Sequence, residues 1–273
     1  MSFVLADNWV DRATIIAHNE VGKMRAENLK TDTVGNCWRA NNLSISGNTV
    51  TLDIQASEPE PTQVLFLQRP RYSRRKEKEP GIETFSATDT IEHQLYSEHD
   101  ATNLLWGSGE QLSGIVKGLG VTGVYLPERV PNVRLWRIIF RAYSRSIAPN
   151  DFIEFGRAVA GDPFKFTTAY AAPLRRGGRS NSTSRRPKAG VSVHRRRAPQ
   201  YRIWAPLFKS IDTDEYESVE DFLLDVGDLT QFLIGLEEDQ PHRTWMLGAI
   251  KDEDLERYSY SWSRLPMTIP ETI

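Results

Sequence analysis

The sequence contains a single cysteine, no long apolar run and no common catalytic signature. With Cys37 alone, an intramolecular disulfide is excluded, and its place beside Trp38 predicts a small buried apolar side chain rather than a reactive thiol. No apolar stretch approaches the roughly 20 residues that a bilayer-spanning helix needs, so no membrane insertion is expected. The first residues lack the basic and apolar regions of a secretory signal, and we therefore expect synthesis in a cytoplasm.

Signatures of hydrolases, metalloproteases and nucleotide-binding enzymes are missing or incomplete, since neither GxSxG nor HExxH occurs. Gly118, Gly120 and Gly123 spell GxGxxG, but the VYLPERVP that follows has no helical period. This pattern predicts a turn between strands instead of a phosphate-binding loop. Two of the many acids could still meet as a glycosidase pair, so a hydrolase stays an open alternative. The prediction is a protein that is not an enzyme, with no catalytic residue and no cofactor.

Two histidines, His93 and His99, lie among the acids Glu92, Glu98 and Asp100. Their spacing of six residues fits neither the i, i+4 pair of a helical metal site nor a two-residue strand pattern. We predict a solvated polar loop at these residues, without a metal.

Acidic residues are absent from residues 163–211, which carry 12 Lys and Arg. Residues 212–273 have the opposite balance, with 16 Asp and Glu against four Lys and Arg. Between 167–173 and 201–208 the basic segment is rich in Gly, Ser, Asn and Pro, which is typical of a flexible arm or long hairpin. We call residues 175–197 the basic arm. Its positive side chains are Arg175, Arg176, Arg179, Arg185, Arg186, Lys188, Arg195, Arg196 and Arg197.

These nine side chains are candidates for a subunit interface. The arm could contact the acidic 212–273 segment, in the same chain or in a neighbour, or it could be a solvated loop. A nucleic-acid contact is a further alternative, although the arm has no interleaved aromatic residues and no recognition helix. Complementary surfaces on one chain favour head-to-tail association, which closes into a ring if the rotation allows.

Short β-branched and aromatic runs elsewhere predict a mainly β fold. The expected strands are 50–55, 62–68, 135–144, 230–236, 244–250 and 257–265, with turns at 58–59 and 237–241 and exposed loops at 69–81 and 107–114.

One clear helix is predicted, with Ser218 as its N-cap, an apolar stripe at i, i+3, i+4 and i+7, and Gly227 as its stop. The expected organisation is a β-sandwich over residues 1–162 and a strand pair bearing the basic arm over 163–211. A small β-sandwich or α+β unit over 212–273 is expected to pack against that strand pair.

Residues 9–160 resemble the galactose-binding-like (discoidin-type) β-sandwich. The resemblance rests on RATIIAHNEVGKMRAENLKTDTVGNCWRA (12–40) and VRLWRIIFRAYSRSIAPNDFIEFGRAVAG (133–161). In that family, sequence segments of this kind lie at the beginning and at the end of the jelly roll. The matching positions here are Ala13-Thr14-Ile15, Asn28-Leu29, Trp38-Arg39, Trp136-Arg137 and Ile153-Glu154-Phe155-Gly156-Arg157.

The order of elements is similar to that of tail proteins of long-tailed bacteriophages and prophages. A sandwich that ends at 153–164 is followed by the basic arm and then by a helix-bearing unit with FLIGLEED at 232–239. This unit is similar to the belt domain of distal tail proteins and to the tail-tube fold. Distal tail proteins usually place the belt domain first, whereas here the order is reversed or interleaved.

The second resemblance implies an architectural role in a virion, at the phage tail tip, for a protein made in the bacterial cytoplasm. The carboxy-terminal unit would form a ring with itself, expected to hold six copies, between tail-tube and tail-tip hub proteins, with DNA only as passing cargo. The basic arm would reach across the acidic surface of a neighbour or line the lumen. The sandwich would carry accessory proteins or bacterial-surface glycans, with Tyr72 and Trp106 as possible stacking contacts. The alternative is a carbohydrate-binding module or accessory subunit outside a virion.

Overall fold

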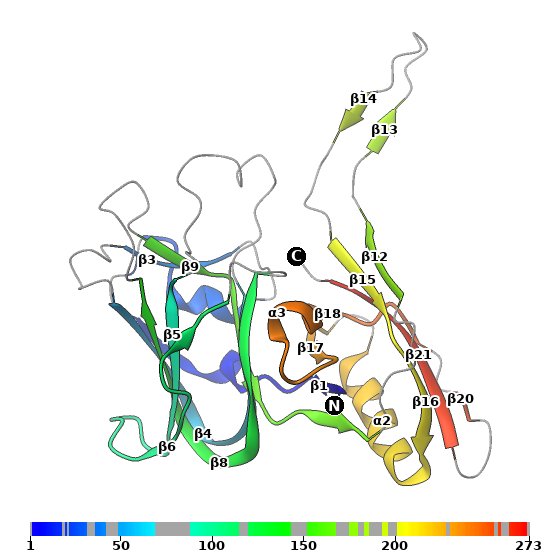
Figure 1. The fold of residues 1–273 in the computed structure, drawn as a ribbon, viewed down its shortest axis with the longest axis horizontal. Coiled ribbons are helices and arrows are strands. Elements are labelled where there is room, and N and C mark those ends of the chain that lie inside the picture. The colour runs from blue at the N-terminus through cyan, green and yellow to red at the C-terminus, as the bar shows by residue number, and fades with distance from the viewer. Residues whose placement is uncertain are drawn as a thin grey trace.

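The structure is a computed structural model that describes residues 2–17, 20, 22–31, 36–41, 49–68, 88–114, 120–142, 152–167, 175–179, 183–185, 193–195, 201–227, 230–253, 256–257 and 262–271. Figure 1 shows these residues as β layers standing side by side, with the ribbon of β13 and β14 extending away from them. Three apolar clusters hold the layers together. The predicted mainly β fold, an amino-terminal sandwich and a carboxy-terminal β unit with a helix, is confirmed.

The sandwich contains a seven-stranded and a two-stranded sheet. The larger sheet consists of β2 (Thr14–Ala17), β4 (Thr49–Gln68), β5 (Thr90–Tyr96), β6 (Leu104–Gly107), β7 (Gln111–Leu112), β8 (Val121–Arg141) and β10 (Arg157–Gly161). The smaller sheet pairs β3 (Trp38–Asn41) with β9 (Phe152–Phe155). Two 3-10 helices, η1 (Trp9–Arg12) and η2 (Ala26–Lys30), add buried apolar side chains to the same core.

Two very long strands, β4 and β8, build most of the sandwich. They pair antiparallel, with register shifts between Gln55 and Val64. Bulges of this kind bend a strand, and residues from both halves of β4, such as Leu52 and Leu65, contribute to one core. The two strands predicted in this region are therefore halves of one bent strand. The turn predicted at 58–59 is wrong, because a bulged strand accommodates proline without ending.

The sandwich core is aromatic where the two segments that carry the discoidin-type resemblance, 12–40 and 133–161, meet. Trp38 of β3 pairs with Phe155 of β9, and their rings stack with centroids 6.0 Å apart. Phe140 of β8 meets Phe155 edge-on at 6.1 Å. Cys37 is buried, as predicted. The words at 12–40 and 133–161, about a hundred residues apart in sequence, thus contribute neighbouring strands.

The next layer is a four-stranded sheet that takes strands from both ends of the chain. Its order is β11 (Phe164–Phe166), β1 (Ser2–Leu5), β17 (Phe232–Gly235) and β18 (Trp245–Gly248). β1 is buried on both faces, since Phe3 and Leu5 contact one apolar cluster and Val4 the other. The expected sandwich over residues 1–162 therefore does not include its first strand, because β1 belongs to the four-stranded sheet. The two units are interleaved, because a doubly buried strand needs a layer on each side.

The outer layer completes the carboxy-terminal unit. It contains β12 (Arg175–Arg179), β15 (Tyr201–Ala205), β21 (Trp262–Pro270) and β16 (Leu207–Asp212), with β19 (Asp252–Glu253) and β20 (Glu256–Arg257) paired to β21. Trp204, Phe208 and Leu265 from this layer meet Ile234 and Met246 from the four-stranded sheet. The strand predicted at 257–265 is thus two elements, and Tyr258 and Tyr260 lie outside the described residues.

The long helix α2 (Thr213–Val226) packs its predicted apolar stripe into that same cluster. Its predicted end is confirmed, because Gly227 follows Val226 with φ +53. Its predicted start at Ser218 is wrong. Glu215 in the first turn accepts hydrogen bonds from the backbone N and Oγ1 of Thr167 at 2.9 and 2.5 Å, and this tertiary contact holds the first turn of the helix against the chain that follows β11. The turn predicted at 237–241 leads into the one-turn helix α3 (Pro241–Thr244).

The sandwich and the carboxy-terminal unit meet through a third apolar cluster. Its members are Phe3, Leu5, Val64, Phe66, Val121, Val159, Leu233, Trp245 and Leu247. The ring of Phe3 meets Trp245 edge-on at 5.0 Å and Tyr125 at 5.1 Å. Aromatic contacts of this kind add to the free energy of area burial and fix the orientation of the two units.

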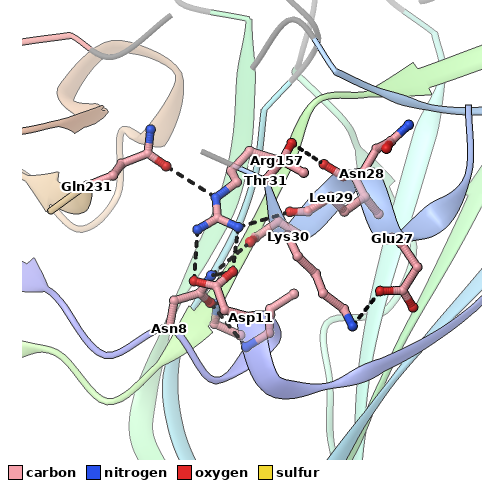
Figure 2. Close-up of polar contacts among 12 residues, drawn as sticks. Asn8, Asp11, Glu27, Asn28, Leu29, Lys30, Thr31, Arg157 and Gln231 are labelled. Carbon is pink, nitrogen blue, oxygen red and sulfur yellow. Dashed lines mark hydrogen bonds and ion pairs between the residues drawn. The ribbon is translucent and has the colours of Figure 1, made fainter. Parts of the chain in front are cut away.

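Arg157, the first residue of β10, crosses the same junction (Figure 2). Its guanidinium forms two hydrogen bonds with Asp11 of η1, at 2.5 and 2.9 Å. It also donates to the carbonyl of Leu29 and to Oε1 of Gln231, each at 3.2 Å. Because Gln231 directly precedes β17, one buried side chain of the sandwich reaches the carboxy-terminal unit.

Candidate functional site

The basic arm is a long antiparallel hairpin that leaves the outer layer. β12 pairs with β15, and beyond them β13 (Thr183–Arg185) pairs with β14 (Val193–Arg195). Within the described residues no third strand joins this ribbon, and Figure 1 shows it standing clear of the other elements. A two-stranded ribbon on its own is marginally stable in water, so this segment gains most from a partner outside its own chain.

Five of the nine predicted arm residues have a described backbone. Arg175, Arg176 and Arg179 lie in β12, Arg185 in β13 and Arg195 in β14. The other four, Arg186, Lys188, Arg196 and Arg197, lie outside the described residues. The basic sequence therefore starts in the outer sheet and continues along both strands of the ribbon.

An acidic surface lies on α2, at the opposite end of the carboxy-terminal unit from the ribbon (Figure 1). The helix contains six acids and no Lys or Arg. Glu217, Glu220, Asp221 and Asp225 are exposed, and Leu224 among them is 76% exposed. We call these five residues the acidic face. These residues occupy the helix positions between those of the buried apolar stripe, so helical periodicity in the sequence could have predicted an acidic face. The structure shows which acids are exposed, because it shows which side of the helix is buried.

The two histidines considered as metal ligands, His93 and His99, lie in different surroundings and do not form one site. The prediction of a solvated loop is wrong for Glu92 and His93, which lie in β5, because the strand alternation turns His93 into the core. Nδ1 of His93 accepts a hydrogen bond from Nε1 of Trp136 at 3.2 Å, and burial lowers the pKa of His93 to about 3. His99 lies at the surface, where its Nε2 contacts the carbonyl of Ala56 at 2.8 Å. In the described part of the chain, no three His, Cys, Asp or Glu side chains gather as metal ligands.

The two described glycines of the GxGxxG pattern, Gly120 and Gly123, have different roles. Gly120 has φ +70 and directly precedes β8, as expected for a turn, and Gly118 lies outside the described residues. Gly123 lies within β8, where a Cβ would come within 2.7 Å of both the Leu65 carbonyl and the Trp245 ring. Glycine at 123 therefore allows the sandwich to approach the carboxy-terminal unit closely.

Of the two possible glycan contacts, Trp106 lies in β6 and Tyr72 lies outside the described residues. Trp106 is partly buried against the sandwich core, which leaves only part of its ring available. Leu104, Leu105 and Leu112 are exposed on β6 and β7, at the margin of the large sheet. The loop predicted at 107–114 thus contains the short strand β7.

No family model and no curated protein matches the sequence. Among solved structures, the chain is similar to the lectin-binding domain of a lectinolysin mutant complexed with Lewis b, with 9% identity, a TM-score of 0.43, and coverage of 57% of this chain and 96% of that one. It is similar to an F5/8 type C domain from Bacteroides fragilis, with 12% identity, a TM-score of 0.41, and coverage of 58% and 95%. It is also similar to the family 32 carbohydrate-binding module of NanJ from C. perfringens, in complex with galactose. The identity is 10%, the TM-score is 0.37, and the match covers 59% of this chain and 98% of that one. Likeness at this level assigns no ligand to this chain.

Among the described residues, no helix combines the length and the apolar character that crossing a bilayer requires.

Proposed function

We propose that the protein is a structural subunit that assembles with copies of itself through the basic arm. The observation that carries the proposal is the ribbon of β13 and β14, which pairs with itself and projects from the outer layer. An arginine-rich ribbon with no acid in its sequence neighbourhood needs an anionic partner to neutralise it. The chain supplies that partner in the acidic 212–273 segment, which favours a contact between protein subunits over one with nucleic acid.

The setting that we propose is the tail tip of a long-tailed bacteriophage or prophage, where the protein would form a ring between tail tube and tip. Support comes from the resemblance in element order, in which a sandwich is followed by the basic arm and a helix-bearing unit. The sandwich would be a peripheral accessory domain, and Trp106 on β6 its possible glycan contact. In this role the protein is a virion component without catalytic activity.

Light scattering at low and high salt tests the proposal on the full chain. At 0.05 M salt we expect a closed oligomer, with six copies as the expected number. At 1 M salt the Debye length falls to about 3 Å and the oligomer should dissociate. Arg195→Glu, Arg196→Glu and Arg197→Glu together should give a folded monomer at low salt.

A chain that is monomeric at every salt and concentration would contradict self-assembly. Binding of DNA with a steep salt dependence, lost in the triple variant, would instead favour the nucleic-acid alternative. Binding to a bacterial-surface glycan by a salt-independent monomer would favour the alternative of a carbohydrate-binding module.

A further inference from the structure

The acidic face of α2 is a helix surface that the described structure leaves uncovered. Its four acids are exposed, and Leu224 is 76% exposed between them. Leu224 contributes little to the packing of its own unit, and it adds an apolar side chain to this charged helix face that an incoming side chain can cover.

No positive group balances this face within the described structure. None of the four carboxylates forms an ion pair with a described side chain, and the last turn of α2 holds no base. Asp225 lies in that last turn, where the carbonyl end of the helix already carries a partial negative charge. Carboxylate and helix end therefore repel each other, and a cation bound there relieves both.

In the same molecule, the described strands of the basic arm lie away from this face. Figure 1 shows the ribbon of β13 and β14 and helix α2 at opposite ends of the carboxy-terminal unit, with the paired strands β12 and β15 leading away from the helix. Within the described residues, the acidic face of α2 therefore has no basic partner. This arrangement favours a partner from another copy over the arm of the same chain.

We propose that the acidic face of α2 is the docking surface for the basic arm of a second copy, which extends the proposed function and rests on it. Guanidinium groups would pair with the carboxylates, and the apolar stem of an arginine would cover Leu224. Because arm and helix are different surfaces of one chain, the contact is head-to-tail, and repetition closes a ring or continues as a filament.

The test reverses charge on the helix while leaving its buried face intact. In the full chain, Glu217→Lys, Glu220→Lys and Asp221→Lys should raise the dissociation constant of assembly about 100-fold or more at low salt. The matched control reverses three exposed acids of the sandwich, Glu58→Lys, Glu98→Lys and Glu128→Lys, and should assemble like the parent. Circular dichroism and thermal melting verify that both variants fold.

A charge swap then distinguishes direct contact from a change in net charge. Mixing the α2-reversed variant with the arm-reversed variant (Arg195, Arg196 and Arg197 to Glu) should restore assembly, because each mixed contact again joins opposite charges. No recovery on mixing, or normal assembly by the α2-reversed variant while the arm-reversed one is monomeric, would overturn the α2 contact and leave the proposed function standing. A parent chain that is monomeric at every salt would overturn both.

Discussion

At the scale of single residues, His93 and Arg157 show how differently two buried polar side chains affect stability. His93 has its Nδ1 bound to Trp136, while Nε2 has no described hydrogen-bond partner. Arg157 donates hydrogen bonds to Asp11, Leu29 and Gln231. The histidine is therefore held neutral, whereas the arginine pairs with a carboxylate and bridges the two units.

His93 should make the protein less stable in acid. Its pKa is about 3 in the folded state and about 6.5 in an unfolded chain, so the unfolded state binds more protons between these values. The free energy of unfolding is unaffected above pH 6.5 and should fall below it by about 1.4 kcal/mol per pH unit from this group. His93→Leu should remove this part of the slope in urea unfolding measured from pH 7 to 4. Parallel pH profiles for parent and variant would contradict the assignment.

Arg157→Met should lower the free energy of unfolding by about 3 kcal/mol, since it leaves hydrogen-bond acceptors at a buried junction without their donor. Asp11 is 41% exposed, so water takes over part of the lost interaction. The control is Arg129→Met, which breaks a surface ion pair with Asp162 and should cost less than about 1 kcal/mol. Equal losses for the two variants in denaturant unfolding would argue against a bridging role for Arg157.

At the scale of elements, the placement of β1 is the least local feature of the fold. Phe3 is 1% exposed and packs against rings from β8 and β18. We expect Phe3→Ala to lower the free energy of unfolding by about 3 to 5 kcal/mol. Ile16→Ala, at a residue that is 45% exposed in β2, serves as control and should cost less than about 1 kcal/mol.

The Phe3 variant should unfold in one transition with both units losing structure together, because the residue lies in the cluster that joins them. Calorimetry checks this expectation. Two separate transitions, with the sandwich unaffected by the substitution, would show that the junction contributes little to cooperativity.

At the scale of the whole molecule, the layers and the charge distribution follow different rules. Burial orders the β layers, and each apolar cluster takes residues from distant parts of the chain. Charge is separated along the sequence, with its basic part on the arm and its acidic part in residues 212–273. The fold places the ribbon of β13 and β14 and helix α2 at opposite ends of the carboxy-terminal unit, and the proposed head-to-tail assembly depends on this arrangement.

Much of this arrangement could be predicted from the sequence where the signal is local. The apolar stripe of α2 and its stop at Gly227 were predictable because helix periodicity and the left-handed conformation depend on neighbouring residues. The arm was recognisable from composition alone. The start of α2 was not, because Glu215 finds its partner in Thr167, far away in the chain. The burial of His93 was missed for a similar reason, since three acids nearby in sequence point away from the core that the histidine enters.

The sequence by itself thus determined the β character of the chain, the basic arm, the acidic segment and the burial of Cys37, all of which follow from residue type and short-range pattern. Only the tertiary structure decided that β1 belongs to the carboxy-terminal unit, that β4 runs as one bent strand, and that the ribbon of β13 and β14 and helix α2 lie at opposite ends of that unit. Strand pairing joins backbone groups that are chemically alike in every residue, so the partner of a strand is set by which layers its side chains fill.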